Sequence, residues 1–271
     1  MNRKHTVEEY LETYPKGLFS KEATFYLAEL YYGKEIFNKA LVAYQSLVKD
    51  QISVYTEKAL TRIIIIMKNN NQQKEAVPYM EQLREIASLD ENKQFAKLNL
   101  MQAYYKLNKY EKALKTSEEV LSFSKLNKTV KWDALKIKAR SFLSLKDTLN
   151  AAEAYKILEK SPETLIVAEA MYFRANNLYH EEKYELSRNL ITNIASISGQ
   201  SGKWKVKSLL LLAKNYYALD DAFQAIFILE SLIENFESYP ELMKEAESLK
   251  IKYQKTLSEE NRSITNDVGN E

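Results

Sequence analysis

A small residue returns along this chain at nearly constant intervals, and no other feature restricts the fold as strongly. Ala40, Ala76, Ala113, Ala151, Ser187 and Ala225 follow one another at 36, 37, 38, 36 and 38 residues. Twelve residues before each of them stands Ala28, Ile64, Met101, Ala139, Ala175 or Ala213. A period of about 20–50 residues indicates one repeated supersecondary unit, whose copies stack because none buries its apolar face alone.

Large side chains occupy the positions that such a unit needs for stacking. Nine residues before each small residue comes Tyr31, Met67, Tyr104, Phe142, Leu178 or Tyr216. Four residues after it comes Tyr44, Met80, Ser117, Tyr155, Ile191 or Leu229. The chain holds only 5 Gly and 4 Pro, too few for the turns of a many-stranded sheet. The spacing therefore predicts an all-α solenoid of antiparallel helix pairs.

The same positions resemble the tetratricopeptide repeat (TPR), a helix pair of about 34 residues with small residues at the helix crossing. The resemblance covers residues 20–237 and implies a right-handed superhelix of about six helix pairs. The pattern is broken by Lys138 and Arg174, which stand in place of leucine, by Ser117, and by Pro78 inside a second helix. The stretch around Trp204 also looks like the C-terminal section of large bacterial proteins of many such repeats.

The pattern predicts four segments. Residues 1–19 form a half-repeat helix, 20–239 the array, 240–257 a C-terminal capping helix and 258–271 a disordered tail. The half repeat indicates the C-terminal piece of a longer array, and a natural N-terminal capping helix is the alternative. Leu242, Ala246, Leu249 and Tyr253 form the apolar stripe expected of a cap. The linker 198–202, with two glycines, is the predicted hinge.

Composition excludes several classes of function. The 39 Lys and Arg balance 37 Asp and Glu, so the basic excess typical of nucleic-acid binding is missing. No apolar run is long enough to span a membrane. With no Cys and two distant His, His5 and His180, no zinc ligand set or catalytic triad can be assembled. We expect no cofactor, no metal and no catalytic residue.

The resemblance implies where a partner would bind, because TPR proteins use the first helix of each pair to line an inner, concave surface. In the second half of the array the inner positions combine Lys and Arg with Tyr and Asn, which suits an extended peptide carrying carboxylates. We expect contacts from Lys136, Arg140, Tyr172, Asn176, Lys207, Lys214 and Tyr217. Ile65 is expected on the same surface nearer the N-terminus, unless a neighbouring repeat buries it.

The predicted function is therefore a non-enzymatic scaffold that binds a protein or peptide partner in its groove. The bacterial resemblance places it in an envelope-associated or periplasmic assembly, provided that it belongs to a longer exported protein. A cytoplasmic regulatory adaptor is the alternative, and a hydrolase with a helical solenoid body is a third possibility. The sequence does not name the partner.

Overall fold

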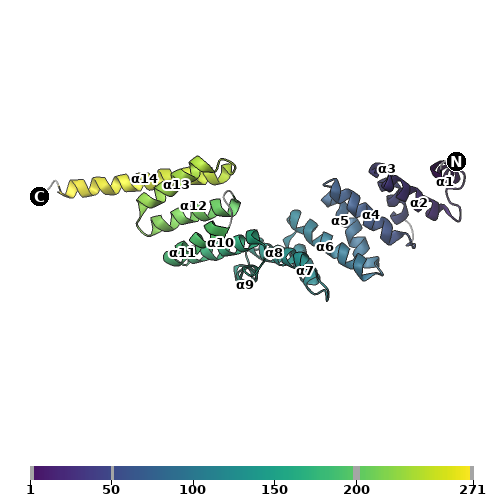
Figure 1. Cartoon of the computed structure of the whole chain (residues 1–271), viewed down its shortest axis with the longest axis horizontal. Helices are drawn as coiled ribbons and strands as arrows, with labels where there is room; N and C mark the ends of the chain where they lie inside the picture. Colours follow the sequence, from purple (N-terminus) through teal and green to yellow (C-terminus); the bar gives the residue numbers. More distant parts are fainter. Residues whose placement is uncertain (1–2, 50–51, 198–201, 269–271) are drawn as a thin grey trace. The chain divides into compact units, whose positions relative to one another are not determined.

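A computed structural model describes residues 3–49, 52–197 and 202–268, and these ranges contain fourteen α-helices and no strand (Figure 1). The chain divides into two compact units, Met1–Lys146 and Asp147–Glu271, called here the N-terminal and C-terminal units. The sequence predicts one continuous array over residues 20–239, so the division falls inside the fourth repeat. Residues 198–201 of the predicted hinge lie outside the described ranges.

The N-terminal unit holds eight described helices. They are α1 (Arg3–Thr13), α2 (Ser20–Gly33), α3 (Phe37–Lys49), α4 (Thr56–Asn69), α5 (Gln73–Ile86), α6 (Asp90–Lys106), α7 (Tyr110–Leu121) and α8 (Lys128–Ser144). Each helix packs against the next, and α6 also contacts α4 and α8. The predicted half repeat is the single helix α1, which packs on α2, where the Tyr31 hydroxyl donates a hydrogen bond to Glu8.

The C-terminal unit continues the pattern with six described helices. They are α9 (Thr148–Leu158), α10 (Thr164–His180), α11 (Tyr184–Ile197), α12 (Lys203–Ala218), α13 (Ala222–Asn235) and α14 (Pro240–Val268). Consecutive helices pack together, and α12 contacts both α10 and α14. These contacts between neighbours confirm the predicted solenoid of helix pairs in each unit.

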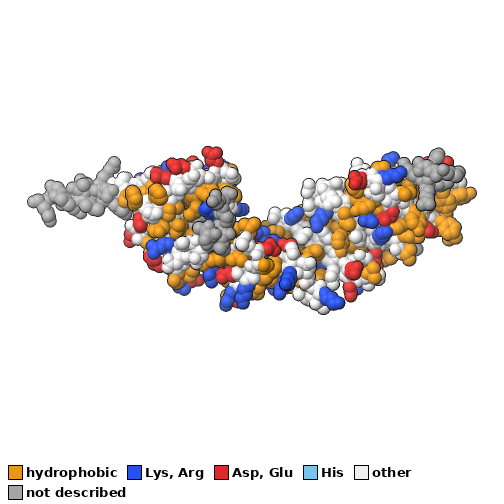
Figure 2. Space-filling view, in the orientation of Figure 1, with side chains coloured by type: hydrophobic (Ala, Val, Ile, Leu, Met, Phe, Trp, Pro, Cys, Tyr) orange, Lys and Arg blue, Asp and Glu red, His pale blue; other side chains and the backbone are white. Residues whose placement is uncertain are grey.

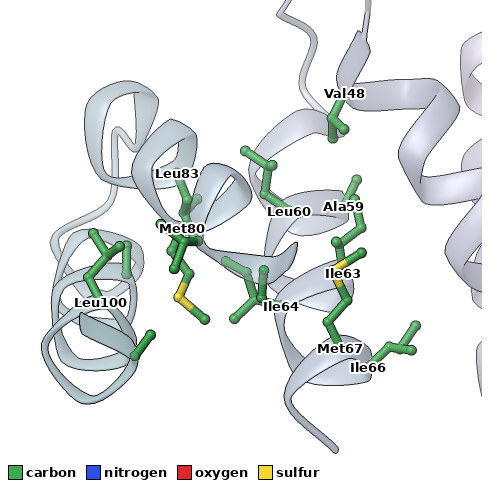
Figure 3. Packing of buried hydrophobic residues seen from close by; sticks show 14 of the residues in the cluster. Val48, Ala59, Leu60, Ile63, Ile64, Ile66, Met67, Met80, Leu83 and Leu100 are labelled. Carbon is green, nitrogen blue, oxygen red and sulfur yellow. The ribbon is translucent and has the colours of Figure 1, made fainter. Parts of the chain in front are cut away.

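The repeated small residues lie where the helices of a pair cross. All six residues from Ala40 to Ala225 in the small-residue series have no exposed surface, and neither have the six residues twelve positions earlier. In the second repeat, Leu60 and Ile64 of α4 point toward Met80 and Leu83 of α5 (Figure 3). Interiors are close-packed, so a large side chain at a crossing must be matched by space in its neighbours. The register read from the sequence is confirmed residue by residue.

The turn inside each helix pair is built in one way throughout. The residue five positions before the small residue has a positive φ, between 57° and 63°, and these residues are Glu35, Asn71, Asn108, Lys146, Glu182 and Asp220. Around Glu35 the backbone forms two crossed hydrogen bonds, from Glu35 N to Tyr32 O (3.0 Å) and from Ile36 N to Tyr31 O (2.9 Å). Helices often end this way, usually with glycine at the left-handed residue. No glycine marks these turns, so the sequence did not reveal them.

The C-terminal end differs from the prediction. Helix α14 does not end near Leu257 but continues to Val268, so residues 258–268 are helical where a disordered tail was expected. No Gly or Pro lies between Pro240 and Gly269 to interrupt the helix. The sequence of this segment has no apolar stripe, which is a different property from lacking a helical backbone. Residues 269–271 lie outside the described ranges.

Two of the departures from the repeat pattern are accommodated at the surface. Lys138 Nζ lies 2.9 Å from Glu118 Oε1, and Arg174 Nη1 lies 3.2 Å from Glu159 Oε2. Long basic side chains can cover apolar surface with their stems while the charged end stays near water. Each therefore replaces leucine without burying a charge.

Candidate functional site

The predicted contact residues are divided between the two units. Of the seven residues expected in the second half of the array, Lys136 and Arg140 lie on α8 of the N-terminal unit. The other five lie on α10 and α12 of the C-terminal unit. Lys136 is half-buried, and its Nζ lies 2.6 Å from Asp133 Oδ1 one turn earlier. Arg140 is also half-buried. The seven residues therefore belong to two surfaces, one in each unit.

The C-terminal unit gathers Tyr172, Trp204 and Lys207 into one group, called here the Lys207 cluster. Trp204 and Lys207 are three residues apart on α12 and so share a helix face. The Lys207 Nζ lies 5.5 Å from the centre of the Tyr172 ring and 5.1 Å from that of Trp204. The two rings are 5.5 Å apart. Aromatic faces attract cations at this range, and the ammonium lies within it of both rings.

Lys207 differs from an ordinary surface lysine in its electrostatics. Burial lowers the pKa of its ammonium, and the like charge of Lys203 one turn earlier lowers it further. Asn176 lies on α10 one turn beyond Tyr172, half-buried on the same helix face. The cluster thus combines a cation with two aromatic faces, and the Asn176 amide lies on the same face of α10 as Tyr172; such groups recognise carboxylates and peptide backbone.

Lys214 and Tyr217 have partners inside the chain. Lys214 Nζ lies 2.7 Å from Glu245 Oε1 of α14. The Tyr217 ring stacks on Tyr253 of α14, with centroids 3.6 Å apart and planes inclined by 7°. The two residues hold the last helix against α12, a role that sequence reasoning missed. The sequence signal that could have revealed this role is the pair Glu245 and Tyr253, an acidic and an aromatic residue eight positions apart on α14.

Ile65 lies on α4 and is half-buried. It lines a small cavity of about 60 Å³ together with Tyr32, Phe37 and Ile66. Neither full exposure in a groove nor complete burial describes its position. Its contact with a partner stays a prediction.

A second cation-bearing surface in the N-terminal unit is internally neutralised. Glu29 on α2 receives Arg62 Nε at 3.1 Å and Lys58 Nζ at 3.0 Å, and the Tyr44 hydroxyl donates to it at 2.5 Å. The Arg62 guanidinium also lies over the Tyr32 ring at 4.1 Å.

In the C-terminal unit, a cavity of about 240 Å³ lies beside Tyr155 and Phe173. The positive charge of Arg174 in its lining is neutralised by the ion pair with Glu159. By contrast, Lys207 has no ion-pair partner among the described residues.

The visible face carries no single-sign region. Lys and Arg side chains are interspersed with acidic and apolar ones (Figure 2). Among the described residues no group of three His, Cys, Asp or Glu could hold a metal ion. None of the described helices combines the length and apolarity that a membrane span needs.

Comparison with known proteins agrees with this architecture. Residues 207–238, which span most of α12 and α13, match the family model of the tetratricopeptide repeat. This segment is a tetratricopeptide repeat. No curated protein sequence matches it.

Several solved structures share the fold of this chain. The C-terminal part of a TPR repeat-containing protein from Cytophaga hutchinsonii is 11% identical, with a TM-score of 0.56 over 89% of this chain and 93% of that chain. The pilF protein of Pseudomonas aeruginosa is 18% identical, with a TM-score of 0.55 over 85% and 97%. A structure of Naa15/Naa10 bound to HypK-THB is 12% identical, with a TM-score of 0.51 over 90% and 36%. At these identities the similarity concerns the fold alone.

Proposed function

We propose that this TPR protein is a non-enzymatic protein–protein interaction scaffold that holds an extended polypeptide on the surface bearing the Lys207 cluster. The fold supports the proposal, because stacked helix pairs create long exposed surfaces suited to binding. One structural neighbour, Naa15/Naa10 bound to HypK-THB, was itself solved as a complex. The observation that carries the proposal is Lys207, a half-buried cation close to two aromatic rings and without a carboxylate partner among the described residues.

The cluster is suited to an acidic peptide. A carboxylate meeting Lys207 would gain a charge-assisted hydrogen bond, while Tyr172 and Trp204 would cover apolar side chains at low entropic cost. Exposed ion pairs contribute only about 0–1 kcal/mol each, so affinity must come from several contacts together. We expect dissociation constants on the order of micromolar, which increase with salt concentration.

The experiment is selection of random peptides displayed on phage against the immobilised full chain. We expect the enriched peptides to combine Asp or Glu with aliphatic or aromatic residues. Binding of a synthetic enriched peptide should weaken about tenfold or more in Lys207→Glu, because attraction becomes repulsion. Lys205→Glu, two residues away on α12, is the matched control and should bind normally. Failure to enrich any peptide, or equal binding by both variants, would refute the proposal.

We infer further that the scaffold belongs to a bacterial envelope-associated assembly. Two of its structural neighbours are bacterial proteins, and the stretch around Trp204 looks like part of large bacterial repeat proteins. A cytoplasmic regulatory adaptor is the alternative. Fractionation of the source cells followed by immunoblotting decides between them, since recovery of the native protein in the cytoplasmic fraction contradicts an envelope location.

A further inference from the structure

A pocket of about 340 Å³ lies in the C-terminal unit beside the Lys207 cluster. Lys203 and Lys207, one turn apart on α12, line one side of it. Tyr239, Glu241 and Leu242, from the end of the α13–α14 loop and the start of α14, line the other side. Two cations therefore face an aromatic and an aliphatic side chain across a volume that admits a small group.

The positive charge of this pocket is not neutralised within the described chain. Glu241, the one acidic residue of the lining, lies 3.5 Å from Lys244. Glu245 and Glu169 both raise the pKa of Lys207 through their charges, but each has a nearer partner. Glu245 pairs with Lys214 at 2.7 Å, and Glu169 accepts a hydrogen bond from Tyr155 at 3.1 Å. No described carboxylate lies within ion-pair distance of Lys203 or Lys207.

An anion in the pocket would relieve an unfavourable arrangement. Two ammonium groups one turn apart repel each other, and partial burial strengthens that repulsion because less water screens it. A carboxylate placed between them satisfies donors of both lysines and removes the repulsion. The neighbouring Leu242 and the ring of Tyr239 provide apolar surface for a side chain next to that carboxylate.

We propose that this pocket binds a carboxylate adjacent to an aliphatic side chain, held by Lys203 and Lys207 with the aliphatic group against Leu242. The inference rests on the proposed peptide-binding function and names the part of the peptide that is recognised. The carboxylate belongs either to the last residue of the bound chain or to an internal Asp or Glu. Both sources present the same chemistry to the two lysines.

Trp204 provides a direct reporter, because its ring lies 5.1 Å from Lys207 and the chain has only one other tryptophan. In the full chain carrying Trp132→Phe, Trp204 is the sole tryptophan. The probes are N-acetyl-leucine, N-acetyl-leucinamide and the amidated dipeptide N-acetyl-Asp-Leu. The first two differ only in the terminal carboxylate, and the third carries its carboxylate on a side chain.

We expect N-acetyl-leucine, the dipeptide or both to change Trp204 fluorescence saturably at millimolar concentrations. The leucinamide should bind at least about tenfold more weakly, because it lacks the charge. Lys203→Gln combined with Lys207→Gln should abolish the response, whereas Lys205→Gln should retain it. If only one of the two acids gives a response, that acid identifies the source of the carboxylate, and the result supports carboxylate binding in the pocket.

Three results would overturn the inference. They are equal responses to acid and amide, no response to either acid up to tens of millimolar, and equal losses in Lys205→Gln and the double variant. None of these results contradicts the proposed peptide-binding function, because peptides selected on the full chain could still bind without a carboxylate in this pocket. Conversely, if selection enriches no peptide, the small probes still report whether the pocket takes a carboxylate.

Discussion

At the scale of single residues, Glu29 shows how a charge can be stabilising inside a repeat stack. Its carboxylate is contacted from two other helices, by Tyr44 of α3 and by Lys58 and Arg62 of α4. Burial alone would raise the pKa of this carboxyl, but the hydrogen bonds from Arg62, Tyr44 and Lys58 outweigh it and lower the pKa to about 2. One residue thus links three consecutive helices.

The lowered pKa of Glu29 predicts a pH dependence of stability. A carboxyl whose pKa is depressed on folding stabilises the protein above its unfolded pKa, and that contribution is lost as pH falls from about 4.5 toward 2. Glu29→Gln should lower the free energy of unfolding at pH 7 by about 1–3 kcal/mol, because charged hydrogen bonds are removed.

Urea denaturation of wild type and Glu29→Gln between pH 7 and pH 3 measures the effect. The difference in the free energy of unfolding between the two proteins should become smaller below about pH 4.5. Glu75→Gln on α5, an exposed carboxylate, is the matched control and should change stability by less than about 0.5 kcal/mol. A difference that is constant with pH would contradict the assigned role of Glu29.

At the scale of elements, the left-handed residue in each helix-pair turn carries backbone strain that glycine would avoid. Glu182 has φ 60°, and its side chain is exposed between α10 and α11. Glu182→Gly should raise the free energy of unfolding by about 0.5–1 kcal/mol, because the Cβ contact that disfavours this conformation is removed.

Glycine substitutions at two other positions serve as controls for the change in stability. Glu181 has a negative φ of −86°, which needs no glycine, so Glu181→Gly should destabilise the protein by about 0.5–1 kcal/mol. Asn71→Gly should gain less than Glu182→Gly, because Asn tolerates the left-handed region better than Glu. Thermal and urea denaturation measure all three variants. Stabilisation by Glu181→Gly, or a loss in Glu182→Gly, would show that the turn is not strained.

Helix α14 is the second element whose role can be tested. Met243, Ala246 and Tyr253 of α14 are buried with Leu229 and Leu232 of α13 in one apolar cluster. A chain ending at residue 236 loses these contacts, so we expect it to aggregate or to unfold at a clearly lower temperature. Truncating a single buried aromatic side chain to Ala typically costs about 3–5 kcal/mol.

The matched control for α14 is a chain that ends at residue 259. It keeps Tyr253 and the Lys214–Glu245 pair but lacks the last turns of the helix. We expect its melting temperature and solubility to be close to those of the full chain. If the chain ending at residue 236 behaves like the full chain, α14 does not cap the C-terminal unit.

At the scale of the whole molecule, contacts between consecutive helices dominate, so stability should be distributed over the repeats. Ile64 and Ile191 are fully buried in different apolar clusters, one in each unit. Each Ile→Val change should cost about 0.5–1.5 kcal/mol, and the double variant should show the sum within about 0.5 kcal/mol. Denaturant titration of the four proteins completes the cycle. A larger coupling energy would mean that the two sites are energetically coupled, which would contradict stability distributed over independent neighbour contacts.

The sequence by itself determined the repeat register and the residues of the helix crossings. All twelve crossing residues are fully buried, because two helices of fixed pitch can approach closely only where small or well-matched side chains recur at that pitch. Apolar burial depends on spacing along the chain, and spacing is visible in the sequence. The same holds for the apolar stripe of α14, whose residues pack in one apolar cluster with α13.

Only the tertiary structure decided which polar partner each long side chain takes. Lys207 and Lys214 are one residue type on one helix, yet Lys214 pairs with Glu245, 31 residues away, and Lys207 lies close to two aromatic rings. A lysine side chain reaches several candidate partners, and the geometry of neighbouring helices chooses among them. The left-handed turns at Glu35 or Glu182 were hidden for a similar reason, since closing a helix pair imposes that conformation on residues that do not prefer it.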